Sequence, residues 1–227
     1  MPVNLEQVVP WGRSLEEYVR MFDLAPCDLQ RRILDCAGGP ASFNCEMHRA
    51  GRAVISADPI YEFSAPQIAR RIEETRETIL RKTAESRENF VWAEVESIER
   101  LSEIRMQAMK AFLDDFPSGL AEGRYLAAEL PHLSFQDHEF DLALCSHFLF
   151  TYSHLLSFDF HLGSVRELCR VAREARIFPL IPNFARGRSP HLQPLIEQLT
   201  NEGYRCEIRQ VPYEFQKGGD EMLQVTS

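Results

Sequence analysis

The chain has 227 residues, a hydrophobic content of 44% and a formal net charge of −9. This composition supports a packed core and argues against disorder, and the length fits one α/β domain spanning 1–227. The chain is acidic and its basic residues are scattered. This argues against a nucleic-acid partner, because phosphate contacts need a basic surface.

The spacing of the cysteines and the length of the apolar runs indicate in which cellular compartment the protein is expected. Six cysteines occur without a Cys-x-x-Cys spacing, which predicts reduced, largely buried thiols and neither a zinc site nor a disulfide framework. No apolar run approaches the ~18 residues of a membrane-spanning helix, and the N-terminus lacks the basic start and apolar core of a signal peptide. We therefore expect a soluble, cytoplasmic protein with no membrane partner.

Residues 1–30 are predicted to form an extended start followed by one helix. Ser14 and Glu17 have the spacing of a capping box, in which each side chain bonds the other residue's backbone N–H. Apolar side chains then recur on one helical face, so this helix is expected to pack on the domain and cover it. The positions are Leu15, Tyr18, Val19 and Phe22.

A glycine turn follows the first predicted strand. The apolar run that starts at Ile33 stops at Asp35, and Gly38 and Gly39 come next. Glycine has no side chain, so the backbone there can bend tightly and approach a ligand closely. A helix capped by Ser42 is expected to follow.

The second predicted strand, 53–57, comes after that helix, which we expect to stop at Gly51. The strand ends on Asp58. Open α/β folds place an acid about 20 residues beyond the glycines, where it accepts both hydroxyls of a ribose. Strand, glycine turn, helix, strand and acid together predict a nucleoside-binding unit.

This stretch resembles the front half of the class I S-adenosylmethionine-dependent methyltransferases. Their motif begins with an acid at the end of the first strand and continues with small residues two, four and six positions beyond it. Here the acid is Asp35, and the small residues are Ala37, Gly39 and Ala41. Because alanine resists positive φ, we expect Gly38 and Gly39 to carry the bend.

Two helical patterns occupy 66–120, where a doubly wound sheet needs only one crossover helix. The first follows a cap at Ser64 and a proline at Pro66 and runs to about Phe90, and the second ends near 114–119. We interpret the segment as a helical insertion after the second strand. It would either cover the ligand end of the sheet as a lid or lengthen the outer layer.

Strand three is predicted over 124–128 and strand four over 140–147, with an acid-Leu-Pro turn and a short acidic loop between them. This pair again resembles class I methyltransferases, in which an acid four positions before that leucine often bonds the adenine amino group. Leu126 stands at this position. Adenine would then be held by backbone groups of Ala127 or Ala128 and by apolar stacking.

The rest of the chain predicts a crossover helix, a fifth strand over 175–180 and a helix capped by Ser189. Two antiparallel strands follow, near 206–211 and 222–225. A mostly parallel sheet that ends in a hairpin is the arrangement of class I methyltransferases. We therefore predict a doubly wound, Rossmann-like α/β fold of about seven strands with helices on both faces.

The resemblance implies S-adenosyl-L-methionine as the cofactor and a small-molecule acceptor. The first turn would line the methionine end, Asp58 would accept the ribose hydroxyls, and Pro59 with Ile60 would flank adenine. Arg13 and Tyr18 are candidates for holding the methionine carboxylate. The expected cofactor contacts are Arg13, Ala37, Gly38, Gly39, Asp58, Pro59, Ala127, Ala128 and Ser146.

His147 is the candidate catalytic residue, because it follows strand four and would point toward the substrate end of an open sheet. A histidine, whose ordinary pKa is about 6.5, can take a proton there from a hydroxyl, amine or thiol. A histidine bonded to neighbouring backbone is the alternative. His147, His154 and His161 recur every seven residues, about 10 Å of helix, so no metal site is expected.

Other enzyme classes lack their motifs in this sequence. The Gly-x-Ser-x-Gly elbow of α/β hydrolases and the phosphate loop of NTPases are both absent. A nicotinamide-dependent oxidoreductase would also use a glycine turn and a ribose acid, but Gly-x-Gly-x-x-Gly is missing. Two alternatives stay open: a non-catalytic protein that binds S-adenosylmethionine or S-adenosylhomocysteine and, less favoured, such an oxidoreductase.

Overall fold

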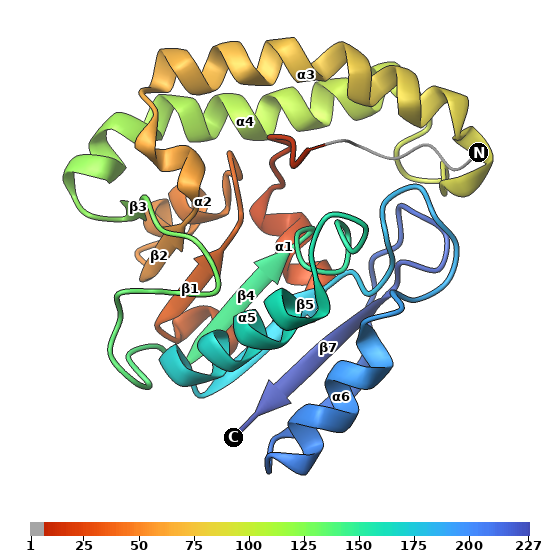
Figure 1. The fold of residues 1–227 in the computed structure, drawn as a ribbon. Helices are drawn as coiled ribbons and strands as arrows, with labels where there is room; N and C mark the ends of the chain where they lie inside the picture. Colours follow the sequence, from red (N-terminus) through yellow and green to blue (C-terminus); the bar gives the residue numbers. More distant parts are fainter. Residues whose placement is uncertain (1–6) are drawn as a thin grey trace.

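The computed structural model describes residues 7–227 and contains a central mixed sheet (Figure 1). Its strands are β1 Ile33–Cys36, β2 Val54–Ala57, β3 Tyr125–Leu126, β4 Leu142–Ser146, β5 Glu174–Phe178, β6 Arg205–Gln210 and β7 Glu221–Thr226. Their order across the sheet is β3-β2-β1-β4-β5-β7-β6. The pairs from β3 to β5 are parallel, whereas β7 runs antiparallel to both β5 and β6. The predicted Rossmann-like sheet with a C-terminal antiparallel hairpin is confirmed.

Helices cover both faces of this sheet. They are α1 Leu15–Met21, α2 Phe43–Arg49, α3 Ala65–Glu85, α4 Ile98–Ala121, α5 Phe158–Val171 and α6 Leu192–Asn201, with short 3-10 turns at Asp28–Gln30, Pro59–Glu62 and Arg87–Asn89. Alternate residues of β4 show the two layers. Ala143 and Cys145 pack in the core with α5 and α6, whereas Leu142 and Leu144 pack in the core with α1 and α2. Within residues 7–227, none of the helices has both the length and the apolar character needed to cross a bilayer.

The long helices α3 and α4 lie side by side across the carboxyl ends of the parallel strands (Figure 1). An apolar cluster joins Ile68 and Ile72 of α3 to Phe112 and Phe116 of α4 and to Tyr125 of β3. The pair therefore has its own core, which is continuous with the edge of the sheet.

Helix α4 ends later than the sequence predicts. It continues through Pro117 to Ala121, beyond the expected stop at 114–119. Burial explains the extension. Phe116 lies in the aromatic cluster, and Gly119 lies so close to the Tyr125 ring that a Cβ atom there would be 2.4 Å from it.

Two predicted serine caps are corrected. Helix α2 follows Ser42, but that residue has helical φ and ψ, so its hydroxyl makes no cap bond and contacts the Glu46 carboxylate. Helix α6 begins at Leu192, and Ser189 accepts a bond from the His191 N–H at 3.2 Å. The capping boxes at Ser14 and Ser64 are confirmed.

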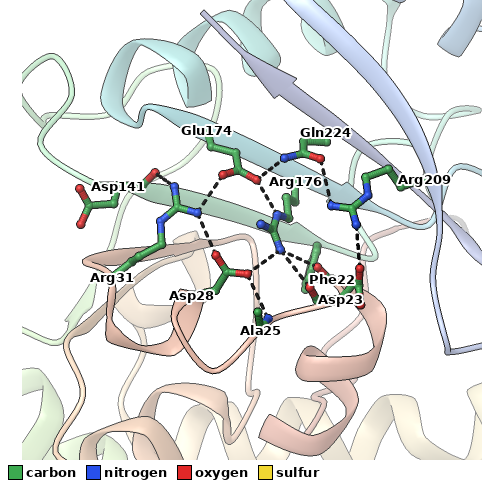
Figure 2. Close-up of polar contacts among 10 residues, drawn as sticks. All are labelled: Phe22, Asp23, Ala25, Asp28, Arg31, Asp141, Glu174, Arg176, Arg209 and Gln224. Carbon is green, nitrogen blue, oxygen red and sulfur yellow. Dashed lines mark hydrogen bonds and ion pairs between the residues drawn. The ribbon is translucent and has the colours of Figure 1, made fainter.

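A buried network of charges ties the segment after α1 to the distal half of the sheet (Figure 2). Arg176 of β5 donates to Asp28 at 3.2 Å, to Glu174 at 2.7 Å and to the Phe22 carbonyl at 2.8 Å. Arg31 bridges the same two carboxylates at 3.0 and 2.8 Å. Each buried charge thus has an opposite partner, as burial requires.

Replacing Arg176 by methionine should destabilise the fold by about 3 kcal/mol, because it leaves buried carboxylates with too little positive charge. Urea denaturation measures the change. Arg205→Met is the control: Arg205 lies on the edge strand β6 and is exposed, and within residues 7–227 its side chain makes a 3.9 Å contact with Glu207. Its effect should stay within about 0.5 kcal/mol. Equal losses for both variants would contradict a special role for the network.

Candidate functional site

A cavity of about 800 Å³ lies at the carboxyl ends of the parallel strands. Its walls come from the turns after β1, β2, β4 and β5, from the N-terminal segment and from α3 and α4. Ten of the predicted site residues line it, namely Arg13, Ala37, Gly38, Gly39, Asp58, Pro59, Ile60, Ala128, Ser146 and His147. Ala127 does not line it.

Helices α3 and α4 contribute to this cavity directly. Arg71, Ile79 and Thr83 of α3 and Leu101 of α4 line it. Both interpretations of segment 66–120, a lid and a longer outer layer, stay predictions.

The turn after β1 bends differently from the prediction. Ala37 and Gly39 take positive φ, 58° and 57°, whereas Gly38 does not. Gly38 is required for space, because a Cβ atom there would lie 2.3 Å from a carboxylate oxygen of Asp35. The expectation that Gly38 and Gly39 carry the bend is therefore wrong for Gly38, since the turn folds around the Asp35 carboxylate.

Asp35 supports this turn from beneath and does not line the cavity. It is 1% exposed; one oxygen accepts a bond from the Tyr18 hydroxyl at 2.9 Å and the other from Ser56 at 3.0 Å. Burial raises the pKa of Asp35 to about 7, although both bonds oppose the shift. Tyr18 is thus engaged with Asp35, and of the two predicted carboxylate ligands only Arg13 lines the cavity.

Asp58 joins the turn after β1 to the turn after β2. Its Oδ2 accepts the Gly39 N–H at 2.9 Å and its Oδ1 accepts the Ile60 N–H at 2.8 Å. Burial raises the pKa of Asp58 to about 6, against the effect of these two bonds. Each oxygen keeps a second lone pair, so the ionised carboxylate can also accept hydroxyl donors from the cavity.

Arg13 belongs to a buried ion cluster, which we define as Arg13, Glu17, Arg105 and Tyr213. Arg105, on α4 and 1% exposed, donates to Glu17 at 2.6 Å, and Tyr213 donates to the same carboxylate at 2.9 Å. Arg13 Nε is 3.9 Å from Glu17 and has no hydrogen-bond partner among residues 7–227. Two guanidinium groups share one carboxylate, which leaves net positive charge beside the cavity.

The cluster shifts the pKa of its members in the expected directions. Burial would raise the pKa of Glu17, but the charges of Arg105 and Arg13 outweigh it and lower that pKa to about 2. Burial and the nearby charge of Arg105 lower the pKa of Arg13. An anion next to Arg13 would relieve this repulsion.

His147 stands at the end of β4 with a positive φ of 51°. Its N–H donates to the Phe178 carbonyl at 2.6 Å, and its ring nitrogen Nδ1 is 2.9 Å from the Ser146 hydroxyl. Burial, followed by the charges of Arg13 and Arg105, lowers the pKa of His147 well below 6.5. The imidazole is therefore neutral at neutral pH.

Sequence reasoning missed Arg105 and Tyr213. Arg105 did leave a signal: it stands in the apolar stripe of α4 between Leu101, Ala108 and Phe112, at helical spacing. A charged residue in such a stripe points to a buried partner. Tyr213 left none, because it lies in the segment between β6 and β7, outside any periodic pattern.

Sequence comparison finds a relative of nearly equal length. The chain is 32% identical over 222 residues to the uncharacterized protein MJ0045 of Methanocaldococcus jannaschii, and the alignment covers 97% of each chain. No protein-family model matches.

Solved structures that align with the chain include the magnesium protoporphyrin IX methyltransferase of Synechocystis PCC 6803 with bound S-adenosylmethionine. Its identity is 14% and its TM-score 0.47, over 93% of this chain and 77% of that one. A TehB-like S-adenosylmethionine-dependent methyltransferase of Corynebacterium glutamicum aligns at 17% identity and a TM-score of 0.45, over 87% and 80% of the two chains.

The low pKa of Glu17 predicts that the fold loses stability in acid. A carboxylate whose pKa is lower in the folded protein than in the unfolded chain stabilises the fold at any pH above its unfolded pKa. For Glu17 the ordinary pKa is 4.5, so its contribution is complete above pH 4.5 and is lost as the pH falls toward about 2. A shift of this size corresponds to about 3 kcal/mol. Glu17→Gln should therefore be less stable at pH 7 and lose less stability between pH 4.5 and 2.

Denaturant unfolding at a series of pH values measures this. Glu16→Gln, at the adjacent exposed position of α1, removes the same charge and should retain the wild-type pH profile. A wild-type profile in Glu17→Gln would contradict the assigned ion cluster.

Proposed function

The chain belongs to the family of the Methanocaldococcus jannaschii protein MJ0045, and we propose that it is an S-adenosylmethionine-dependent methyltransferase acting on a small-molecule acceptor. The observation that carries the proposal is the bond between the Gly39 N–H and Asp58, 2.9 Å long, at the mouth of the cavity. It joins the glycine turn to the ribose acid beside the switch point between β1 and β4, where open α/β sheets bind nucleosides.

The residues of the cavity fit this cofactor. Asp58 would accept the ribose hydroxyls, and Pro59 with Ile60 would flank adenine. Ala128 would supply a backbone contact to the base, and the turn 37–39 would line the methionine end. The methionine carboxylate would meet the net positive charge of the ion cluster, where a buried nitrogen of Arg13 has no partner among residues 7–227. A charge-assisted bond would satisfy that nitrogen.

The bound cofactor would supply an electrophilic methyl group, so the protein's task is in-line positioning and removal of the acceptor's proton. His147 is the residue we assign to the proton. If its Nδ1–H donates to Ser146, its Nε2 is unprotonated and can accept a proton from the acceptor. Its lowered pKa keeps the ring in this neutral form at neutral pH.

Calorimetric titration tests the cofactor assignment. S-adenosylhomocysteine should bind with a micromolar Kd, whereas NADH and NADP⁺ should not. Asp58→Ala should weaken binding about tenfold or more, since a buried ribose contact contributes about 1.5–3 kcal/mol. Asp58→Asn separates this loss from misfolding of the turn, because the amide oxygen can still accept one backbone bond.

Asp114→Asn on the exposed side of α4 is the matched control and should leave affinity unchanged. Unchanged affinity in both Asp58 variants would remove the ribose assignment. Binding of a nicotinamide cofactor alone would favour the oxidoreductase alternative.

His147→Ala should lower turnover about tenfold or more, as expected when a general base is lost, without changing the affinity for S-adenosylhomocysteine by more than about twofold. Release of S-adenosylhomocysteine in the presence of an accepted substrate measures turnover. His138→Ala, an exposed histidine of the loop before β4, should behave like wild type. Full activity in His147→Ala would end its assigned role, and a wild type that binds the cofactor without turnover would favour the non-catalytic alternative.

A further inference from the structure

Part of the cavity is enclosed by aromatic side chains from four separate segments. We define this aromatic chamber by Phe148 and Tyr152 after β4, Phe184 after β5, Phe90 after α3 and Phe215 before β7, all of which line the cavity. The Phe90 ring lies 5.9 Å from the Phe184 ring and 4.9 Å from the Phe215 ring, measured between centroids. The Phe148 and Tyr152 rings are 6.5 Å apart.

The chamber walls carry no charge. The residues of 148–160, 179–184 and 215–219 that line the cavity include no Asp, Glu, Lys or Arg. The charged residues of the cavity come from other segments and are Arg13, Asp58, Glu62, Arg71 and Glu129. Because an unpaired charge is costly to bury, the chamber favours an uncharged occupant.

Most polar groups of the chamber are already engaged by the protein. The amide nitrogen of Gln216 donates to the carbonyls of Pro182 and Ala185 at 2.9 and 2.8 Å, and its oxygen accepts the Phe184 N–H at 3.2 Å. The Tyr152 hydroxyl accepts the Val9 N–H at 3.2 Å. The Gln216 amide is therefore occupied by the wall itself, whereas the Tyr152 hydroxyl accepts one bond and keeps its own O–H as a donor.

Asn183 is different. Its backbone N–H donates to the Thr151 carbonyl at 2.9 Å, and the half-buried residue lines the cavity with no side-chain hydrogen bond to residues 7–227. The neighbouring Thr151 hydroxyl is buried and also has no partner there. Free polar atoms at an otherwise apolar wall point to a ligand that carries a hydrogen-bonding group.

We propose that the aromatic chamber is the acceptor site and that the acceptor is an uncharged aromatic molecule with a hydroxyl group; this rests on the methyltransferase function proposed above. Flat rings suit the chamber, because aromatic pairs add about 0.5–1.5 kcal/mol beyond the area they bury. A hydroxyl both donates and accepts, so it can meet the Asn183 amide and the unprotonated Nε2 of His147.

The chemistry of transfer to such an acceptor balances. The hydroxyl oxygen forms a bond to the methyl carbon as the bond from that carbon to sulfur breaks. The hydroxyl proton passes to His147 Nε2, and S-adenosylhomocysteine is the leaving group. The neutral imidazole is the form of His147 that this step requires.

The test is calorimetric titration of the protein, with and without saturating S-adenosylhomocysteine, using three probes of one shape and different charge. The probes are 2-naphthol, 2-naphthoate and 2-naphthylmethylamine. We expect 2-naphthol to bind at least about tenfold more tightly than either charged probe, a difference of about 1.4 kcal/mol. Phe184→Ala and Asn183→Leu should each weaken 2-naphthol binding about fivefold or more and leave S-adenosylhomocysteine affinity within about twofold.

Asn183→Asp tests the chamber in the opposite way, by adding a charge to its wall. The added negative charge should shift the preference from 2-naphthol to 2-naphthylmethylamine. Tighter binding of a charged probe by the wild type, or unchanged 2-naphthol affinity in Phe184→Ala and Asn183→Leu, would overturn the acceptor assignment. If S-adenosylhomocysteine still binds in that case, the proposed cofactor function survives; if only 2-naphthol binds, the cofactor assignment fails and the chamber is supported.

Discussion

The buried carboxylate of Asp35 is the constraint on which the ligand end of the sheet depends. It accepts hydroxyl bonds from Tyr18 of α1 and Ser56 of β2, and it leaves no space for a side chain at Gly38. One acid thereby sets the position of the covering helix, the second strand and the turn after the first. This turn places the Gly39 N–H against Asp58. Asp35 therefore shapes the turn from the buried side, and Asp58 contacts the same turn from the cavity.

Two buried charge networks hold the N-terminal segment at its two ends. At one end Glu17 of α1 binds Arg105 of α4 and Tyr213 of the segment between β6 and β7. At the other, Asp28 is bound by Arg176 of β5. Removing one member of such a network leaves an uncompensated charge, so these contacts specify position more strongly than apolar packing alone would. The first network also links α4 and α1 to Arg13 and Tyr213 in the cavity wall.

His147 and the wall of the aromatic chamber are both uncharged. Burial and the nearby arginines keep the imidazole uncharged, and the chamber contributes no charged side chain to the cavity wall. The same low polarity that lowers the pKa of His147 disfavours a charged occupant. Positive charge reaches the cavity from Arg13 and from Arg71 of α3, and the proposed site places the anionic end of the cofactor beside Arg13.

Local patterns in the sequence were enough to predict the strands, most of the helices, the capping boxes and the acid at Asp58, because periodicity and caps depend on residues a few positions apart. The positive φ of Ala37 could not be predicted in this way, since it follows from the buried carboxylate of Asp35 and not from the propensity of alanine. Helix α4 likewise continues past Pro117 because its end is buried against Tyr125.

Long-range partners were decided only by the tertiary structure. Glu17 meets Arg105 across 88 positions and Tyr213 across 196. The aromatic chamber is formed by residues of four segments. In the sequence, each of these phenylalanines and the tyrosine has the pattern of an ordinary core residue. No local rule relates such residues, because only the packing of the sheet, the helices α3 and α4 and the carboxyl-end loops brings them together. The sequence alone therefore determined the elements and the position of the glycine turn, and the packing of those elements decided which charges and rings surround the cavity.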